Sequence, residues 1–270
     1  MKRIYYLLIA IITIFLTYCS SDKETGYSES KLAGLGKKGF ISISSTDIQQ
    51  SQNFYQKLGF KPLENRLEGP NPWALLSNGQ VELMISQNRF PSPALTYFAH
   101  NMEKRLKKLQ QEGVVISNII RSEGKFISAV LMDPNGLGIT LIQFNEKDLP
   151  ESKKITPDTQ FLFSNLSLPT KDLKHSVEFW QKLGFQITNQ SNNPYPRAKM
   201  TDGVITIALL QTDDFTRPIL NFILRTDQLP QKVLEKCGLL QERDSLNDST
   251  GQILLQSPDG DKIVIESQKL

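Results

Sequence analysis

The sequence predicts an α+β protein of four β-α-β-β-β modules that are paired into two similar domains. Two observations support this prediction: an internal repeat at an offset of about 125 residues and, within each copy, a strand followed by an amphipathic helix and further strands. The composition is that of an ordinary globular protein, with 39% hydrophobic and 22% charged residues. A length of 270 residues suffices for one large or two small domains.

The repeat is clearest in two fourteen-residue segments. Asp47–Phe60 reads DIQQSQNFYQKLGF and Asp172–Phe185 reads DLKHSVEFWQKLGF, with eight identities at an offset of 125. Turn residues recur at offsets of 124 or 125: Asn78-Gly79 with Asp202-Gly203, Gly113 with Gly238, and Pro134-Asn135-Gly136 with Pro258-Asp259-Gly260. We therefore expect domain 1 at residues 38–147, a linker at 148–157 and domain 2 at 158–270.

Within the first copy, the elements follow from local patterns. Gly39–Ser44 alternates apolar and small residues, which is typical of a half-buried strand. Asp47 then precedes apolar residues at helical spacing, so it can cap a helix that Gly59 ends. Three further elements are predicted: strands at Val81–Ile85 and Ile139–Phe144, and a helix at Glu103–Glu112. The helices are expected to cover the outside of a curved sheet.

Residues 1–18 have the pattern of an export signal, because Lys2 and Arg3 precede fifteen uncharged residues. This apolar run is shorter than the roughly 20 residues of a membrane-spanning helix. Leu16-Thr17-Tyr18-Cys19 resembles the lipobox of bacterial lipoproteins, although Tyr18 departs from the small residue usual there. The resemblance implies acylation of Cys19, with palmitate as one acyl group, and a place in the bacterial cell envelope. An uncleaved anchor and an ordinary secretory signal are the alternatives.

Residues 19–37 are rich in Ser, Lys, Glu and Gly, and they predict a flexible tether. The formal charge of +3 falls to +1 without residues 1–18, because 29 basic and 28 acidic residues remain. We therefore expect no nucleic-acid partner. Two His and two Cys are too few for a disulfide scaffold or a zinc site with several His and Cys ligands.

The repeated F-Y/W-Q-K-L-G-F stretch, together with a later Pro-x-Gly turn before an apolar strand, resembles the vicinal oxygen chelate superfamily. This superfamily includes glyoxalase I, bleomycin-resistance proteins and extradiol dioxygenases. The resemblance covers both domains and implies the tandem βαβββ fold. It does not imply one function, because the fold serves enzymes and plain binding proteins alike.

Metal-dependent members of the superfamily carry His on the first and fifth strands of the pocket and Glu on the fourth and eighth. Alignment by register places the first-strand position at Phe40 and Asn165 and the fifth-strand position near Ala94 and Leu220. The fourth-strand position falls at Glu82 and Thr206, and the eighth-strand position at Thr140 and Val264. Glu82 alone is of the expected type, and one carboxylate does not make a divalent-metal site. His100 and His175 fall outside pocket-facing positions. The resemblance therefore implies no metal, no other cofactor and no catalytic residue, which disfavours an enzyme.

Strand alternation predicts the side chains that face the pocket. The candidate ligand-binding residues are Phe40, Ser42, Glu82, Met84, Thr96, Phe98 and Thr140 in domain 1, with Asn165 and Thr206 in domain 2. Domain 1 is expected to have a mixed cleft in which Glu82 orients an amine or hydroxyl, acts as a general base, or pairs with water or an Arg. Domain 2 is expected to be more apolar, with Leu220, Phe222 and Val264 in the pocket.

Three functions fit the sequence. The favoured hypothesis is a membrane-tethered protein that binds a small molecule without catalysis. The second is a structural or protein-interaction module with filled clefts, and the third is a metal-dependent enzyme of the glyoxalase or dioxygenase kind. The sequence does not specify the ligand, the inner or outer membrane, or the oligomeric state.

Overall fold

The structure is a computed structural model that describes residues 34–36, 38–144, 155–156, 160–240, 245–247 and 252–269. The predicted signal peptide lies outside the described residues, as do most of the tether and most of the linker.

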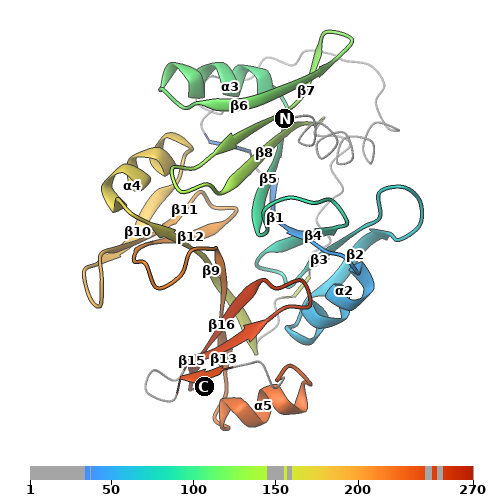
Figure 1. The fold of residues 1–270 in the computed structure, drawn as a ribbon, viewed down its shortest axis with the longest axis vertical. Helices are drawn as coiled ribbons and strands as arrows, with labels where there is room; N and C mark the ends of the chain where they lie inside the picture. Colours follow the sequence, from blue (N-terminus) through green and yellow to red (C-terminus); the bar gives the residue numbers. More distant parts are fainter. Residues whose placement is uncertain are drawn as a thin grey trace.

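Domain 1 contains two β-α-β-β-β modules (Figure 1). The first comprises β1 (Lys38–Ser44), α2 (Ile48–Lys57), β2 (Lys61–Arg66), β3 (Trp73–Ser77) and β4 (Glu82–Ser86). The second comprises β5 (Ala94–Ala99), α3 (Met102–Gln111), β6 (Ile116–Ser122), β7 (Lys125–Met132) and β8 (Gly138–Gln143).

Domain 2 repeats this arrangement. Its first module comprises β9 (Phe161–Thr170), α4 (Leu173–Lys182), β10 (Gln186–Ser191), β11 (Arg197–Thr201) and β12 (Thr206–Gln211). Its second comprises β13 (Ile219–Arg225), α5 (Pro230–Lys236), β14 (Ser245–Asn247), β15 (Gln252–Gln256) and β16 (Lys262–Gln268). The predicted α+β class and the four modules in two domains are confirmed.

Each domain forms one eight-stranded sheet. The strand orders are β2-β3-β4-β1-β5-β8-β7-β6 and β10-β11-β12-β9-β13-β16-β15-β14. The first strands of the two modules are antiparallel neighbours at the centre of each sheet, β1 with β5 and β9 with β13. Each of them also runs parallel to the last strand of its own module. The four central strands of each domain are therefore the first and last strands of its modules.

The repeated motif forms α2 and α4 as the sequence predicts. The Asp47 carboxylate accepts a hydrogen bond from the Gln50 amide at 3.0 Å, and Asp172 accepts one from the His175 amide at the same distance. These are N-caps that satisfy amides of the first turn. Gly59, just past the end of α2, has a φ of 84° that favours glycine.

The two faces of each sheet differ in what covers them. In β1, Ile41 and Ile43 are fully buried in one cluster with Tyr55 of α2, whereas Phe40 belongs to a separate cluster on the opposite side. We call the face that packs against the helices the proximal face, and the opposite one the distal face. The predicted orientation of these β1 side chains is correct.

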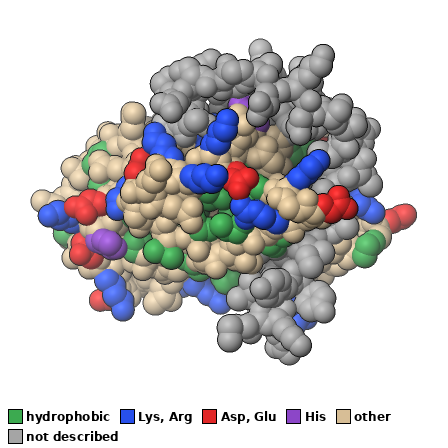
Figure 2. Space-filling model, turned by 90° about the horizontal axis from the view of Figure 1, so that it is seen from above, with side chains coloured by type: hydrophobic (Ala, Val, Ile, Leu, Met, Phe, Trp, Pro, Cys, Tyr) green, Lys and Arg blue, Asp and Glu red, His purple; other side chains and the backbone are tan. Residues whose placement is uncertain are grey.

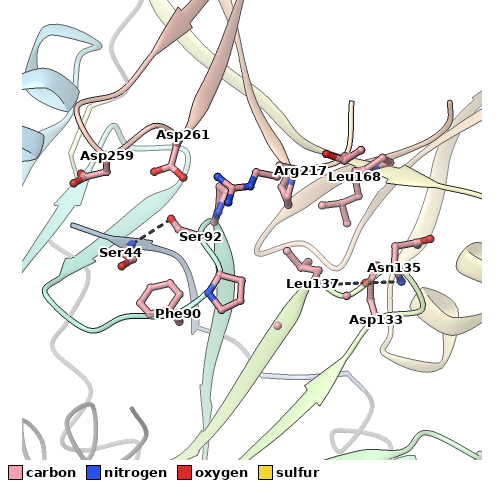
Figure 3. Close-up of a pocket in the computed structure, with 17 residues that line it drawn as sticks. Ser44, Phe90, Ser92, Asp133, Asn135, Leu137, Leu168, Arg217, Asp259 and Asp261 are labelled. Atoms are coloured by element: carbon pink, nitrogen blue, oxygen red, sulfur yellow. Dashed lines mark hydrogen bonds between the residues drawn. The ribbon is translucent and has the colours of Figure 1, made fainter. Parts of the chain in front are cut away.

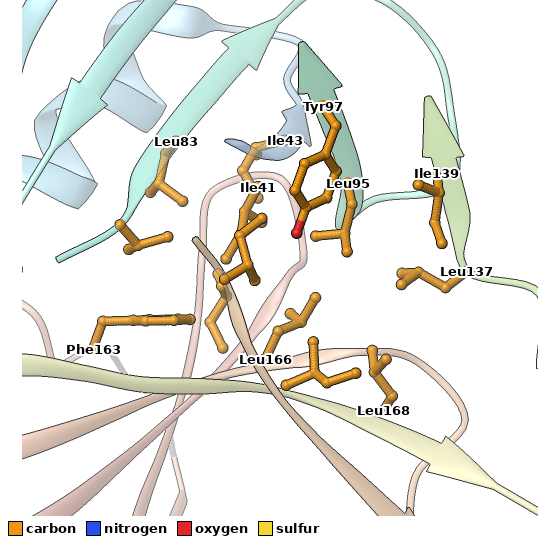
Figure 4. Packing of buried hydrophobic residues seen from close by; sticks show 14 of the residues in the cluster. Ile41, Ile43, Leu83, Leu95, Tyr97, Leu137, Ile139, Phe163, Leu166 and Leu168 are labelled. Carbon is orange, nitrogen blue, oxygen red and sulfur yellow. The ribbon is translucent and has the colours of Figure 1, made fainter. Parts of the chain in front are cut away.

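The proximal faces of the two domains also pack against each other (Figure 4). Ile41 and Leu95 of domain 1 lie opposite Leu166 of domain 2, and all three are fully buried. The ring centroids of Phe60 and Phe222, from different domains, are 6.1 Å apart. The hydrophobic core is therefore continuous between the domains, which exclude water from a shared apolar surface.

Polar contacts connect the domains reciprocally. The Asn135 amide, in the turn before β8, donates to Ser176 Oγ of α4 at 3.1 Å. In the equivalent turn of domain 2, Asp259 accepts hydrogen bonds from the Thr46 amide at 3.0 Å and from the Ser51 hydroxyl at the start of α2. Each Pro-x-Gly turn thus holds the first helix of the other domain.

The described chain begins with a segment that is packed on both domains. Leu35 is 1% exposed, and Arg105 donates a hydrogen bond to the Gly34 carbonyl at 3.0 Å. A Cβ at Gly184 of domain 2 would lie 2.7 Å from Gly34 Cα, so this approach requires glycine. These residues, 34–36, belong to the predicted tether, and their backbone is part of the folded body.

The face shown in Figure 2 carries basic and acidic side chains of both signs, mixed with hydrophobic ones. In the part of the chain that the structure describes, no helix has the length and apolar character needed to cross a membrane.

Candidate functional site

The register of domain 1 brings the predicted residues together on its distal face. Phe40 pairs with Thr96 across β1 and β5, and Thr96 pairs with Thr140 across β5 and β8. Ser42 pairs with Met84 across β1 and β4. The other two members of the predicted set, Glu82 and Phe98, lie on the same face.

This distal face of domain 1 is largely apolar. The ring centroid of Phe98 lies 5.1 Å from that of Phe40 and 5.8 Å from that of Phe144, and each of the three side chains is at least nine-tenths buried. The cluster comprises Phe40, Trp73, Leu75, Phe98, Ile142 and Phe144, with Leu63 and Met84 packed against it. The hydroxyls of Ser42 and Thr96 are hydrogen bonded to each other at 2.8 Å. These two hydroxyls, which alternation predicts on this face, thus satisfy each other.

Glu82 has a cationic partner. Lys38 Nζ lies 3.6 Å from Glu82 Oε2, and the two side chains are 11% and 14% exposed. The same ammonium lies 5.5 Å from the Phe40 ring centroid, within the range of a cation–π interaction. Of the roles expected for Glu82, the structure supports pairing with a cation, which is Lys38 rather than an Arg.

The distal face of domain 2 carries a polar network. Asn221 lies opposite Asn165 across β13 and β9. The Asn221 amide donates to Ser167 Oγ at 2.8 Å and to Asn165 Oδ1 at 3.3 Å, and the Ser167 hydroxyl donates to the same Asn165 oxygen at 3.0 Å. Both Asn side chains are half-buried. The network thus joins two adjacent strands through side chains that solvent can still reach.

A β-bulge in β9 extends this network. Asn221 pairs with Asn165, but Phe222 pairs with Phe163, so Ser164 is an extra residue in β9. Ser164 Oγ accepts hydrogen bonds from the Asn165 amide at 3.0 Å and from Lys199 Nζ at 3.3 Å. Lys199 is half-buried, and none of the described residues provides it with a carboxylate.

Domain 1 has no such bulge, since β1 and β5 pair without interruption from Lys38 to Ser42. Bulges commonly re-aim side chains beside functional sites. The bulge therefore distinguishes the domain 2 face from its repeat.

The fifth-strand prediction for domain 2 is wrong by one residue. Leu220 and Phe222 are fully buried on the proximal face, and Asn221 lies on the distal face instead. A one-residue shift reverses the face of every side chain in a strand. The predicted pocket of domain 2 is therefore not uniformly apolar, because Asn165 and Asn221 lie beside Val264 on this face. The repeat itself contains the correction, because an offset of 125 from Thr96 gives Asn221.

Thr206, the second predicted site residue of domain 2, lies at the start of β12. Its hydroxyl is 3.4 Å from Thr201 Oγ1, and the next residue, Ile207, pairs with Leu166 of β9. Thr206 therefore lies on β12, the strand adjacent to β9 with Asn165. Sequence reasoning missed Ser164, Lys199 and Asn221 as members of this face.

The structure aligns the metal-ligand positions that the family resemblance implies. Asn165, Asn221 and Val264 lie in register on three adjacent strands of domain 2, as Phe40, Thr96 and Thr140 do in domain 1. Val264 has no donor atom, and the Asn165 oxygen already accepts two hydrogen bonds. Within the described ranges, no group of three or more His, Cys, Asp or Glu could hold a metal ion. These residues do not fit a divalent metal.

Among solved structures, the chain is similar to a catechol 2,3-dioxygenase, with a TM-score of 0.57 over 87% of this chain and 89% of that one, at 10% identity. The chain has the fold of the extradiol dioxygenases. It is also similar to homoprotocatechuate 2,3-dioxygenase from Arthrobacter globiformis, with a TM-score of 0.54 at 18% identity over 87% of this chain and 80% of that one. The Brevibacterium fuscum enzyme of the same name gives 0.56 at 17%, over 87% and 72%. No protein-family model and no curated protein matches the sequence.

Proposed function

We propose that this protein is a lipid-anchored, non-catalytic binding protein with the extradiol dioxygenase fold. Its second domain binds a small polar molecule on the distal face. The observation that carries the proposal is the Asn165–Ser167–Asn221 network, in which the two Asn residues occupy positions where metal-dependent proteins of the superfamily have ligands. Amide and hydroxyl groups offer both donors and acceptors, and such groups orient ligands in binding sites.

The neighbouring charge suggests the ligand's chemistry. Among the described residues, Lys199 Nζ donates a hydrogen bond to Ser164 Oγ alone, so the ammonium retains unused donors beside the network. A carbonyl or carboxylate oxygen would complete this set. The bulge at Ser164 supports the assignment, because it is present in domain 2 and missing from the equivalent pairing in domain 1.

The names of the similar structures indicate dioxygenase chemistry for those proteins, but the aligned side chains of this chain differ from those that such chemistry requires. Mononuclear non-haem iron oxygenases commonly use two His and one carboxylate with open coordination positions. The corresponding side chains in domain 2 are Asn165, Asn221 and Val264. The amides are weak ligands and the Val is none, so the donor set favours binding over metal catalysis.

For domain 1, the mutual packing of Phe40 and Phe98 and the Lys38–Glu82 pair support a structural role for the distal face. This is the filled-cleft hypothesis applied to one domain only. The predicted residues Phe40, Ser42, Glu82, Met84, Thr96, Phe98 and Thr140 would then stabilise the sheet rather than bind the molecule.

Native mass spectrometry and metal analysis of the purified protein test the proposal. We expect a co-purifying small molecule, whose occupancy falls at least about tenfold in Asn221→Leu because the substitution removes donors from the network. Thr140→Val is the matched control, because Thr140 lies in register with Phe40 and Thr96 on the distal face of domain 1. This variant should retain the molecule. Stoichiometric Fe, Mn, Zn or Ni would contradict the proposal, as would loss of the molecule from the Thr140 variant alone.

The lipid anchor has a separate test. In bacteria fed labelled palmitate, the wild-type chain should incorporate label and Cys19→Ser should not, because the thiol is the acceptor. Cys237→Ser is the control, since Cys237 is a free, half-buried thiol in the folded body, and this variant should be labelled normally. Labelling of the Cys19 variant would refute the anchor.

A further inference from the structure

A cavity of about 320 Å³ lies between the two domains (Figure 3). Its walls come from equivalent parts of both repeats: the end of the first strand, the loop between the two modules and the Pro-x-Gly turn. This volume is at the lower end of the range for small-molecule sites, which occur preferentially at domain interfaces. Thr216 and Arg217 are exposed at its edge, so solvent can enter.

The two sides of the cavity differ in charge although the repeat makes them equivalent. At offsets of 124 or 125, the residues Ser92, Asn135 and Leu137 of domain 1 correspond to Arg217, Asp259 and Asp261 of domain 2. Asp133 of domain 1 is the remaining charged residue in the lining. Three carboxyl groups thus face one guanidinium, and the cavity has an excess of acidic groups.

Two of the three carboxyl groups have structural partners. Asp133 Oδ1 accepts hydrogen bonds from the amides of Asn135 and Leu137, at 2.9 Å and 2.7 Å. Asp259 accepts hydrogen bonds from Thr46 and Ser51, which connect the domains. Asp133 Oδ2 accepts no hydrogen bond, but Oδ1 is fixed by the amides of its own turn, and Asp259 is engaged in the contacts between the domains.

Asp261 is held by hydroxyls rather than by amides, because its hydrogen-bond partners are Ser92 and Ser257. It is 6% exposed, and its Oδ2 atom accepts no hydrogen bond from any described residue. Figure 3 shows its carboxyl group and the guanidinium end of Arg217 turned toward each other, but the two form no ion pair. Burial raises the pKa of Asp261 to about 6; Ser92, Arg217 and Ser257 oppose this rise, and the nearby Asp259 adds to it. Near neutral pH, Asp261 is therefore a buried carboxylate whose negative charge is only partly compensated by its neighbours.

We propose that this cavity binds a small organic cation, a primary amine, with the Asp261 carboxylate as its counter-ion. An ammonium supplies three donors and one positive charge, which are what the carboxylate lacks. Phe90, Pro93 and Leu168 provide apolar wall for a short alkyl chain. The site is separate from the distal face of domain 2, so it goes beyond the proposed function.

Titration calorimetry of the full chain with n-butylamine tests this site. We expect saturable binding to the wild type that weakens at least about tenfold in both Asp261→Asn and Asp261→Leu, because each removes the charge. Leu is the residue at the equivalent position 137, so the second variant should fold. Arg217→Ser introduces the residue found at the equivalent position 92. It should strengthen binding, since it removes a positive charge that repels the ammonium. Glu103→Gln, which removes an exposed carboxylate outside the cavity, is the matched control and should leave the affinity unchanged.

The pH dependence provides a second readout. The charged and titratable groups that face Asp261 are Asp259, Arg217 and Tyr55, with Asp133 elsewhere in the lining. Burial keeps the pKa of Tyr55 well above 10, so this phenol stays neutral. Butylamine remains protonated at all relevant pH values, and its affinity should therefore fall as the pH drops below about 6, where Asp261 becomes protonated.

Three results would overturn the proposal. The first is no saturable binding of butylamine to the wild type at millimolar concentrations. The second is equal affinity of the wild type and Asp261→Asn. The third is tighter binding of butyrate than of butylamine, with loss of butyrate in Arg217→Ser, which would make the cavity an anion site centred on the guanidinium.

Discussion

Asp261 places an acidic group where its repeat equivalent, Leu137, has an apolar one. Burial is the main cause that raises the pKa of Asp261 from its ordinary value of 3.8 to about 6 in the folded protein. The folded chain therefore binds this proton more tightly than the unfolded chain. Asp261 contributes stability that is fully present below pH 3.8 and is lost as the pH rises through about 6.

We therefore expect Asp261→Leu to be more stable than the wild type near neutral pH, by about 3 kcal/mol at most, from a pKa shift of about two units. Urea unfolding of both proteins at about pH 4 and about pH 7.5 would measure this effect. The difference between the two free energies of unfolding should grow with pH. A difference that is the same at both pH values would show that burial of the charge does not destabilise the wild type.

Single residues of the candidate site were predictable to different degrees. The distal face of domain 1 followed from simple alternation in β1 and β4, where Phe40 and Met84 are placed correctly. In domain 2, the pair Ser164-Asn165 interrupts the alternation of apolar residues, and this interruption marks the bulge. Lys199 could not be assigned, because its contact with Ser164 joins strands 35 residues apart.

At the scale of elements, the bulge in β9 can be removed without changing the faces of the other residues. Deletion of Ser164 leaves Phe163 proximal, Asn165 distal and Leu166 proximal, which is the regular pairing of β1 with β5. We expect the deletion variant to fold with a melting temperature close to that of the wild type. It should lose the co-purifying molecule, because Lys199 and Asn165 lose their shared acceptor.

Thermal unfolding of the deletion variant would test whether it folds, and native mass spectrometry would test whether it loses the molecule. A folded variant that retains the molecule would show that the bulge is not part of the site. Loss of folding would show instead that the bulge is needed for pairing of β9 with β13. The Asn221→Leu variant, which leaves the backbone register intact, distinguishes loss of the site from loss of the fold.

The secondary structure elements were predictable where one side is buried. Helices α2 and α3 and the central strands have apolar periodicity, and they form as expected. The strands β2 and β10 lie at the edges of their sheets and are almost entirely exposed. Such strands bury neither face, so their sequences lack the alternation that identifies a strand.

At the scale of the whole molecule, the packing between the domains was not predictable. The apolar side chains of the proximal faces have the same pattern whether a helix or another sheet covers them. The sequence therefore predicts helices over the sheet, whereas the structure shows that the second domain covers part of the same face. Phe60 and Phe222 illustrate this, because their contact joins residues from different repeats.

The reciprocal contacts of Asn135 with Ser176, and of Asp259 with Ser51, have the geometry of an isologous dimer whose subunits are joined in one chain. In a dimer of identical subunits, every substitution at the two-fold interface occurs twice, so a new carboxylate would face its own copy. Fusion removes that constraint. One half can gain a charge while the other remains neutral, and a symmetric interface can thereby become an asymmetric binding site.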